Sequence, residues 1–342
     1  MHRILIIAPN WIGDAVMSQP FLAALKLNYP KSQIDVLATP WVAPIYRACP
    51  EIHSVIEAPL EHKKLQWALR RQLAQDLKVM SYQACYVLPN SFKSALIPWL
   101  ANIPFRLGYR GEARFGLINF ALNNPSKTER PPMVERYLAL AHLLNNEGQA
   151  QNIGSPVPSL QSSAEITHTT QDKLARANIK PHALYIFCPG AEYGVTKRWP
   201  ADYFAALAEK VLGQNIENQI ILLGSQSDHH SGQIIAQQNP DRIHNWCGET
   251  SLDEAMAVIG LSKTVISNDS GLMHIAAALQ KPQIAIFGSS DPKHTPPLSN
   301  QAKVIWLNLP CSPCHRRECP LGHLKCLKEI SPEQVFNSIT AE

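Results

Sequence analysis

The sequence predicts an α/β protein made of two Rossmann-like, doubly wound domains that face each other across a cleft. At 342 residues the chain is long for one domain, and two is the usual number at this length. In each half, short apolar runs alternate with segments of helical apolar spacing. This alternation is typical of parallel sheets covered by helices, and a cleft between two such domains is a natural ligand site.

The first half opens on a strand, a loop and a helix. A continuous apolar run at 4–8 predicts a strand buried on both faces of a sheet. Residues 9–14 are expected to form a loop, and 15–27 has helical spacing that Pro20 interrupts early. Two further strands are predicted at 34–38 and 84–88.

A second helix is predicted over 65–79. It is amphipathic and carries the basic residues Arg70, Arg71 and Lys78. Such a helix either lies on a membrane surface or presents an ordinary solvated face. The solvated face is the more common case, and we expect it here.

The two domains are expected to meet within 152–170, which is rich in Pro and Ser and predicted to be linker. We assign 1–160 to the first domain and 161–342 to the second, with a last helix free to pack back on the first. The strands expected in the second domain are 184–188, 219–223, 264–267, 283–287 and 303–307, and the helices are 201–212, 228–238, 252–259 and 271–279.

Composition narrows the function classes. Apolar residues make up 45% of the chain and charged residues 17%, which suits a globular protein with sizeable cores. The net charge of +4 fits an anionic substrate and falls short of a strongly basic nucleic-acid binder. No apolar run is long enough to span a membrane, and the N-terminus has no signal-peptide pattern. We therefore expect a cytoplasmic protein with reduced thiols or metal-bound cysteines.

The stretch 265–279 reads as a buried strand, a polar turn and an Ala-rich helix. Asn268, Asp269 and Ser270 are good N-cap residues. The first N–H groups of such a helix are unpaired and favour an anion, and the small residues Ser270 and Gly271 let a phosphate approach the backbone. A diphosphate site is one interpretation, and an ordinary strand-to-helix turn fits the local pattern equally well.

Other polar residues follow predicted strands. Lys197 and Arg198 come after the strand at 184–188 and can supply positive charge to the same diphosphate. The turn at 224–228 is another small polar turn of the same kind. No G-x-G-x-x-G follows a strand and no Walker-type motif is present, which argues against NAD enzymes and P-loop NTPases.

In the first half, Asp14 follows Gly13 at the end of the first strand, where ligands of such sheets bind. Lys93 follows a later strand in the same way. The segment 106–114 is expected to be a loop. It carries three arginines, Arg106, Arg110 and Arg114. Their guanidinium groups suit the recognition of a carboxylate or phosphate. The alternative is that they are ordinary solvated charges of a loop.

Four motifs in this order resemble the ADP-heptose:lipopolysaccharide heptosyltransferases, which are inverting glycosyltransferases of the GT-B fold. They are most like the heptosyltransferase II branch, which adds the second inner-core heptose. The motifs are Asn10-Trp11-Ile12-Gly13-Asp14, Cys188-Pro189-Gly190-Ala191-Glu192, Lys197-Arg198-Trp199-Pro200 and Asn268-Asp269-Ser270-Gly271-Leu272-Met273-His274.

The resemblance implies that a sugar hydroxyl of the lipopolysaccharide core attacks the anomeric carbon while ADP leaves. Asp14 is then the general base, and Lys197 offsets the charge that develops on ADP. Asp269 is placed for the heptose hydroxyls, Ser270 and Gly271 for the diphosphate, and Glu249 for the adenosine ribose. The other implied donor contacts are Gly190, Thr196, Arg198, Asn268 and His274, and the implied acceptor contacts are Lys93, Arg106, Arg110 and Arg114.

Each role has a plainer alternative. Asp14 also fits a helix N-cap, and Lys197 fits a surface lysine before a helix. Glu249 fits a cap for the helix that begins near Leu252. His274 lies one turn into a helix, where a packed or hydrogen-bonded histidine is more common than a catalyst.

The implied partners are ADP-heptose, an acceptor of the heptosyl-Kdo-lipid A type and the inner face of the inner membrane, contacted peripherally through basic loops. The implied reaction requires no nucleic acid and no metal, and it is compatible with stimulation by Mg²⁺. The alternatives are a GT-B enzyme for a UDP- or GDP-sugar, heptosyltransferase I-type acceptor use, and a non-catalytic nucleotide-sugar-binding module.

Four cysteines near the C-terminus form a separate signal. Cys311, Cys314, Cys319 and Cys326 are close in sequence, with His315 and His323 among them. Four thiolates in a short span can bind zinc, but this spacing does not repeat a C-x2-C pair. Free thiols or a disulfide formed on purification are the other interpretations.

Overall fold

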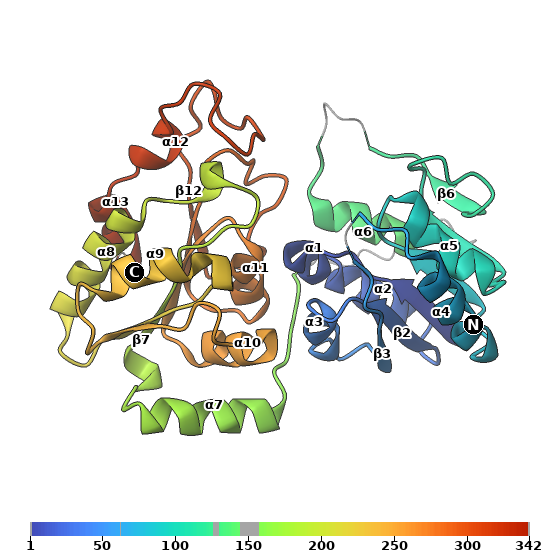
Figure 1. Ribbon diagram of the computed structural model, residues 1–342, viewed down its shortest axis with the longest axis horizontal. Helices are drawn as coiled ribbons and strands as arrows, with labels where there is room; N and C mark the ends of the chain where they lie inside the picture. Colours follow the sequence, from blue (N-terminus) through green and yellow to red (C-terminus); the bar gives the residue numbers. More distant parts are fainter. Residues whose placement is uncertain (1, 62, 126–129, 144–156, 341–342) are drawn as a thin grey trace. The chain divides into compact units, whose positions relative to one another are not determined.

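The computed structural model describes residues 2–61, 63–125, 130–143 and 157–340 (Figure 1). Contacts divide the chain into two compact units, Met1–Leu160 and Gln161–Glu342. In the described part of the chain, no helix is long and apolar enough to cross a membrane.

The described residues of the first unit form a six-stranded sheet in the order β3-β2-β1-β4-β5-β6, and every pair is parallel. The strands are β1 (Arg3–Ile7), β2 (Gln33–Ala38), β3 (Ser54–Glu57), β4 (Ala84–Val87), β5 (Phe105–Tyr109) and β6 (Phe120–Leu122). The helices are α1 (Ile12–Met17), α2 (Gln19–Asn28), α3 (Ala43–Arg47), α4 (Trp67–Val79), α5 (Phe92–Leu100) and α6 (Met133–Ala141).

Both faces of this sheet are packed. Leu5 and Ile7 of β1 join the core cluster that α4 and α5 complete on one face. On the other face, Tyr86 of β4 meets Phe21 of α2 with their ring centroids 5.3 Å apart. Since alternate residues of a strand point to opposite faces, the continuous apolar runs of β1 and β4 fill both layers.

The described residues of the second unit form another six-stranded parallel sheet, in the order β12-β11-β10-β7-β8-β9. The strands are β7 (Leu184–Cys188), β8 (Gln219–Leu222), β9 (Ile243–Asn245), β10 (Thr264–Asn268), β11 (Gln283–Ile286) and β12 (Ala302–Ile305). The helices are α7 (Ala164–Arg176), α8 (Ala201–Gln214), α9 (His229–Ala236), α10 (Leu252–Leu261), α11 (Gly271–Ala278), α12 (Lys325–Lys328) and α13 (Pro332–Thr340), with 3₁₀ turns η1 (Pro181–Ala183), η2 (Val195–Lys197) and η3 (Gln226–Asp228).

The second core contains an aromatic cluster. The ring of Phe204 on α8 lies 4.9 Å from that of Trp199 and 5.8 Å from that of Phe187 on β7. Helix α13, the last helix, contacts α8 and β11 of its own unit. On the opposite face of the sheet, Met273 of α11 packs with Ala285 of β11.

The two sheets share one strand order. In each, the first strand of the unit lies beside the fourth, so β1 neighbours β4 and β7 neighbours β10. In each unit the first three strands are added toward one edge of the sheet, and the last three strands are added from the centre toward the other edge. Ligands in such sheets bind beyond the carboxyl ends of the strands at this switch point.

Several sequence predictions need correction. The helix expected at 15–27 is two helices, α1 and α2, with Ser18 between them, and Asp14 lies inside α1 rather than in a loop. The predicted linker is wrong from residue 164 onward, because Ser163 caps α7 by accepting from Ile166 N; its residues 152–156 lie outside the described residues. Strands β3, β5, β6 and β9 were not predicted.

Candidate donor and base sites

The candidate diphosphate site of the second unit lies where β10 ends and α11 begins. Asn268 ends the strand, Asp269 follows, and Ser270 is the N-cap of α11, which starts at Gly271. The Ser270 side chain makes no capping bond, and its buried hydroxyl has no partner among the described residues. A helix N-terminus with an unused hydroxyl can therefore offer several donors to a phosphate.

A buried ion pair lies beside this turn. Lys197, at the end of η2, places its Nζ 2.5 Å from Asp269 Oδ2. The Asp269 side chain is only 4% exposed and that of Lys197 18%. Ser290, in the loop after β11, donates its hydroxyl to the same carboxylate oxygen. The structure thus brings together two residues, Lys197 and Asp269, that are 72 positions apart in the sequence.

Asn268 holds the fold together instead of facing a ligand. Its Oδ1 accepts from the backbone N–H of Trp199 at 3.0 Å, and its Nδ2 donates to the Pro189 carbonyl at 2.7 Å. The side chain is fully buried. Asn268 therefore ties the end of β10 to the segments after β7, and its amide is not available as a donor contact.

Arg198 and Gly190 also serve the local fold. Arg198 donates from Nε to the Ala191 carbonyl at 3.0 Å, and its Nη2 lies 3.5 Å from Asp228 Oδ1. A Cβ on Gly190 would lie 2.3 Å from the carboxylate carbon of Asp228, so this position needs glycine because Asp228 approaches closely. Arg198 and Gly190 thus contact other residues of the protein in this structure, whereas the sequence analysis expected them to contact the donor.

Thr196 joins the loop after β7 to the cysteine-rich segment. It is buried, its hydroxyl donates to the Arg316 carbonyl, and it accepts from the Ser289 hydroxyl at 3.0 Å. Glu249 is exposed at the turn after β9. The cap of α10 is Ser251, whose side chain accepts from Glu254 N, so Glu249 is not that cap.

His274 is buried within α11 near the ion pair. Burial lowers its pKa to about 4; the charge of Asp269 opposes this shift, and the smaller effect of Lys197 adds to it. The imidazole is therefore neutral near pH 7. This agrees with a packed histidine and not with a catalyst that titrates near neutrality.

The depressed pKa of His274 predicts a pH-dependent stability. The unfolded chain takes up this proton near pH 6.5 and the folded chain only near pH 4. Stability from this group is thus complete above pH 6.5 and falls by up to about 3 kcal/mol as the pH drops to 4. Urea unfolding of wild type and of His274→Gln, at pH 7 and at pH 4.5, measures this loss of folding stability. Equal losses of stability in both proteins would contradict this role.

In the first unit, Asp14 lies half-buried in the first turn of α1. The N-cap of this helix is Trp11, so the alternative of Asp14 as an N-cap is wrong. Tyr137 of α6 is buried and hydrogen-bonded to Asp14. Burial first, and then the charge of Asp14, raise the pKa of the Tyr137 hydroxyl well above its usual range. Tyr137 is therefore a neutral donor that can orient the carboxylate.

A small cavity lies at the carboxyl ends of the central strands of the first unit. It measures about 50 Å³, and Asn10, Thr39, Arg70, Ser91 and Lys93 are among its lining residues. The Thr39 hydroxyl is buried with no partner among the described residues. Lys93 is half-buried and donates to the Lys64 carbonyl at 3.3 Å.

The predicted acceptor arginines separate into two kinds. Arg106 belongs to β5, so 106–114 is not all loop, and its guanidinium donates to the carbonyls of Ile103 and Leu117 at 2.6 and 2.7 Å. Arg114 is buried and donates to Pro89 O at 2.6 Å. Both guanidinium groups shape the fold, whereas Arg110 is exposed.

All eight cysteines are free thiols. Burial first, and then the nearby thiols of Cys311, Cys314 and Cys319, raise the pKa of Cys326 to about 11. Among the residues that the structure describes, no group of three or more His, Cys, Asp or Glu side chains is arranged to hold a metal ion.

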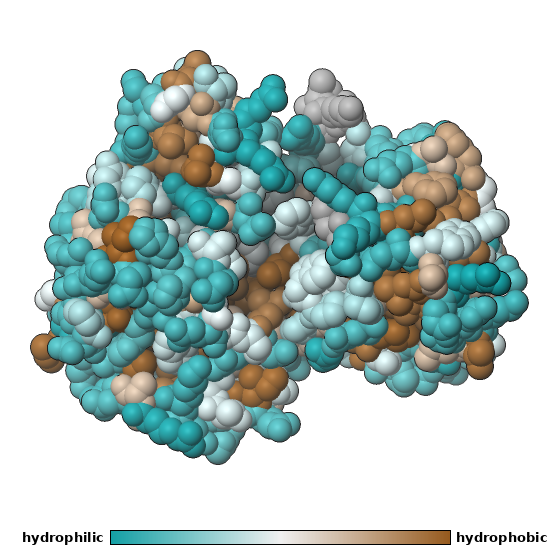
Figure 2. Space-filling model, viewed as in Figure 1, coloured by the Kyte–Doolittle hydropathy of each residue, from teal (hydrophilic) through white to brown (hydrophobic). Residues whose placement is uncertain are grey.

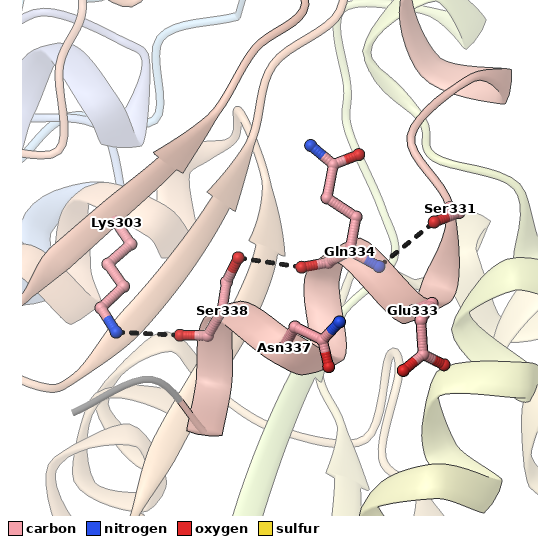
Figure 3. A pocket seen from close by; sticks show the side chains of 6 residues that line it. All are labelled: Lys303, Ser331, Glu333, Gln334, Asn337 and Ser338. Carbon is pink, nitrogen blue, oxygen red and sulfur yellow. Dashed lines mark hydrogen bonds between the residues drawn. The ribbon is translucent and has the colours of Figure 1, made fainter.

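A larger pocket of about 690 Å³ lies beside α13 (Figure 3). Its polar groups bond to one another: Lys303 Nζ donates to the Ser338 carbonyl at 3.0 Å, and Gln334 N donates to the Ser331 hydroxyl at 3.2 Å. None of the four motifs contributes to its lining.

Three residues of these sites were missed by sequence reasoning. Ser290 follows the strand β11, so the rule that picked out Asp269 could have found it. Tyr193 directly follows the motif that ends at Glu192, and Lys197 Nζ lies 5.2 Å from the centroid of its ring. Tyr137 is 123 positions from Asp14 and has no sequence signal, because only packing of α6 on α1 brings it there.

Two Rossmann-like sheets of one strand order, with a helix N-terminus and a partly buried lysine at the second switch point, define a GT-B glycosyltransferase. The model of glycosyltransferase family 9 (heptosyltransferase) matches residues 70–325, and the chain belongs to this family.

Individual relatives cover nearly the whole chain. Lipopolysaccharide heptosyltransferase 2 of Escherichia coli K12 is 40% identical over 346 residues, which span 99% of this chain and 98% of the relative. Lipooligosaccharide heptosyltransferase 2 of Haemophilus ducreyi is 39% identical over 350 residues, 98% of each chain. The solved E. coli ADP-heptose LPS heptosyltransferase II has a TM-score of 0.84 at 38% identity, covering 98% and 97%. These matches confirm the family resemblance.

Proposed function

We propose that this chain transfers a heptose from ADP-heptose to the first heptose of the lipopolysaccharide inner core, with inversion at the anomeric carbon. The observation that carries the proposal is the 40% identity over 99% of the chain to lipopolysaccharide heptosyltransferase 2. The polar groups found at both switch points suit the two halves of such a reaction.

The second unit would hold the donor. Lys197, the Ser270 hydroxyl and the N-terminal N–H groups of α11 are suited to the diphosphate, where charge grows as ADP leaves. Asp269 can accept hydrogen bonds from heptose hydroxyls, and Glu249 from the ribose. Because these groups can stabilise the leaving group, we propose that no metal is required. Stimulation of turnover by Mg²⁺ is compatible with this arrangement.

The first unit would supply the general base. Asp14 is half-buried, so part of its side chain is open to solvent, from which the acceptor hydroxyl would approach. Tyr137 would hold its carboxylate in one orientation. In this role Tyr137 is a positioning residue, because it acts through Asp14.

Tyr137→Phe should lower the transfer rate about tenfold, which corresponds to one hydrogen bond to a charged group. It should also move the acidic limb of the kcat profile to higher pH, because the bond favours the charged carboxylate. A pH series on the variant measures both. Tyr82→Phe is the control, since the Tyr82 hydroxyl donates to Asp35 and not to Asp14; equal shifts in both variants would contradict the positioning role.

The acceptor would bind over the carboxyl edge of the first sheet. Lys93 beside the 50 Å³ cavity and the exposed Arg110 are our candidates for its carboxylates and phosphates. Arg106 and Arg114 would stabilise the backbone of this surface without contacting the acceptor, because their guanidinium groups donate to backbone carbonyls.

We further propose that the enzyme works in the cytoplasm and contacts the inner face of the inner membrane peripherally. The basic loop before α4 carries the exposed Lys63 and Lys64 and leads to the exposed Trp67, and α4 packs against α5 with its exposed Trp99. Figure 2 shows apolar side chains on the visible face of the first unit. Indole rings beside basic side chains suit an anionic lipid surface. Sedimentation with anionic vesicles tests this contact, and no binding would contradict it.

The decisive experiment incubates the chain with ADP-heptose and a core acceptor that bears one heptose. We expect mass analysis to show one added heptose. Competition with ADP, UDP and GDP should favour ADP; preference for another nucleotide would support a different GT-B enzyme. Nucleotide binding without any product would support a non-catalytic module.

A further inference from the structure

We propose that Arg317, on the segment between Cys311 and Cys326, is a second cation of the donor diphosphate site. The inference rests on the proposed function, because it concerns the same ADP-heptose site. It goes beyond the four sequence motifs, none of which includes this segment.

Two cationic side chains lie over the aromatic ring of Tyr193. Lys197 Nζ lies 5.2 Å from its centroid, and Arg317 Cζ lies 5.3 Å from the same centroid. Each contact is within the range of a cation–π interaction. One aromatic ring thus brings the guanidinium of Arg317 into the neighbourhood of the lysine assigned to the leaving group.

The backbone that carries Arg317 is firmly attached at this place. The Tyr193 hydroxyl donates to the His315 carbonyl at 2.7 Å, and His315 N donates to the Ser289 carbonyl at 2.8 Å. The Ser312 hydroxyl donates to the Gly288 carbonyl at 2.6 Å. These bonds join the segment both to the loop after β7 and to the loop after β11.

Gly194 shows how closely the two loops approach. Its φ is +153°, and a Cβ at this position would lie 2.6 Å from the Arg317 carbonyl oxygen. Only glycine therefore allows this contact without displacing the backbone of Arg317. The backbone position of Arg317 is therefore fixed by contacts with the neighbouring loops.

The charges explain why a second cation is needed. The positive charge of Lys197 is paired with the buried Asp269 at 2.5 Å, so this pair adds no net charge to the site. A diphosphate leaving group is an anion whose charge grows as the bond to the sugar breaks. Arg317 is exposed, and in the part of the chain that the structure describes its guanidinium has no carboxylate partner. Guanidinium suits bidentate phosphate recognition.

The neighbouring Arg316 provides a matched control. It is also exposed, and its carbonyl accepts from Thr196, a bond that a side-chain substitution leaves in place. Among the described residues, the cations over the Tyr193 ring are Lys197 and Arg317, and Arg316 is not one of them. Arg316→Ala and Arg317→Ala remove the same charge from adjacent positions of one segment.

The test measures the affinity of the full chain for ADP and for AMP, which lacks the second phosphate, by titration calorimetry. Arg317→Ala should weaken ADP binding about tenfold, corresponding to about 1.4 kcal/mol, and change AMP binding less than twofold. Arg317→Lys should recover part of the ADP affinity, and Arg316→Ala should match wild type for both nucleotides.

Three outcomes would overturn the inference: wild-type ADP affinity in Arg317→Ala, equal losses for ADP and AMP, or equal losses in the two alanine variants. The first two deny a contact with the second phosphate, and the third indicates general electrostatics of the segment. If the wild-type chain fails to bind ADP at all, the proposed donor itself is wrong, and the inference falls with it.

Discussion

Replacing Asp14 by Ala or Asn should abolish heptose transfer while leaving the affinity for ADP-heptose near wild type. A general base typically contributes about 10²–10⁴-fold to a rate, and neither side chain can take the proton of the attacking hydroxyl. The proposed donor contacts all belong to the second unit, so donor binding should not depend on Asp14. Turnover by mass analysis and donor affinity by calorimetry measure the two effects separately.

Asn is the sharper of these substitutions, because its amide oxygen can still accept from Tyr137 and keep the contact with α6. Asp76→Asn serves as the control, since Asp76 is an exposed carboxylate on α4 that accepts from Gln72. It should retain the wild-type rate. Near-normal turnover in Asp14→Asn would remove Asp14 as the base.

Lys197→Ala should weaken both ADP-heptose binding and the rate of transfer. Loss of one preorganised group that stabilises developing charge costs about 10²–10³-fold in rate. The variant also leaves Asp269 with its side chain only 4% exposed and without its cation. Breaking a buried pair in this way costs about 3–5 kcal/mol of folding stability, so stability has to be measured beside affinity.

The double variant Lys197→Met with Asp269→Asn separates the two effects. It removes the unpaired buried charge and should recover folding stability, while ADP affinity and rate stay low. Lys173→Ala is the control, because this lysine forms a more exposed pair with Glu254, and exposed pairs contribute at most about 1 kcal/mol. Unchanged ADP affinity in Lys197→Ala would contradict the phosphate role.

The central strands were predictable because they are buried on both faces. β1, β4, β7 and β10 read as continuous apolar runs, and the structure finds each of them. Short edge strands escaped prediction: β6 at Phe120–Leu122 and β9 at Ile243–Asn245 have three residues each and are partly exposed. Their apolar patterns are too short to distinguish a strand from a loop.

Polar residues at strand ends were found by sequence, but their partners were not. Asp269 and Asn268 are adjacent and both buried, yet Asp269 pairs with Lys197 whereas Asn268 bonds only to backbone groups. Arg106 and Arg114 looked like acceptor ligands, although nearby carbonyls occupy their guanidinium groups. Local sequence cannot predict the partners of Asp269 and Asn268, because they lie 69 to 79 positions away. Even the Ile103 carbonyl, three positions from Arg106, meets the guanidinium only once the chain is folded.

The sequence by itself determined the α/β class, the strands that form the centre of each sheet, and the four motifs at their carboxyl ends. Burial on both faces and helix-start chemistry are local properties, so they can be read from neighbouring residues. Only the tertiary structure decided which polar side chains are committed to the fold, and it alone brought Tyr137 to Asp14 and Arg317 to Tyr193. Those contacts join segments more than a hundred residues apart, and they arise from the packing of helices and loops on the finished sheets.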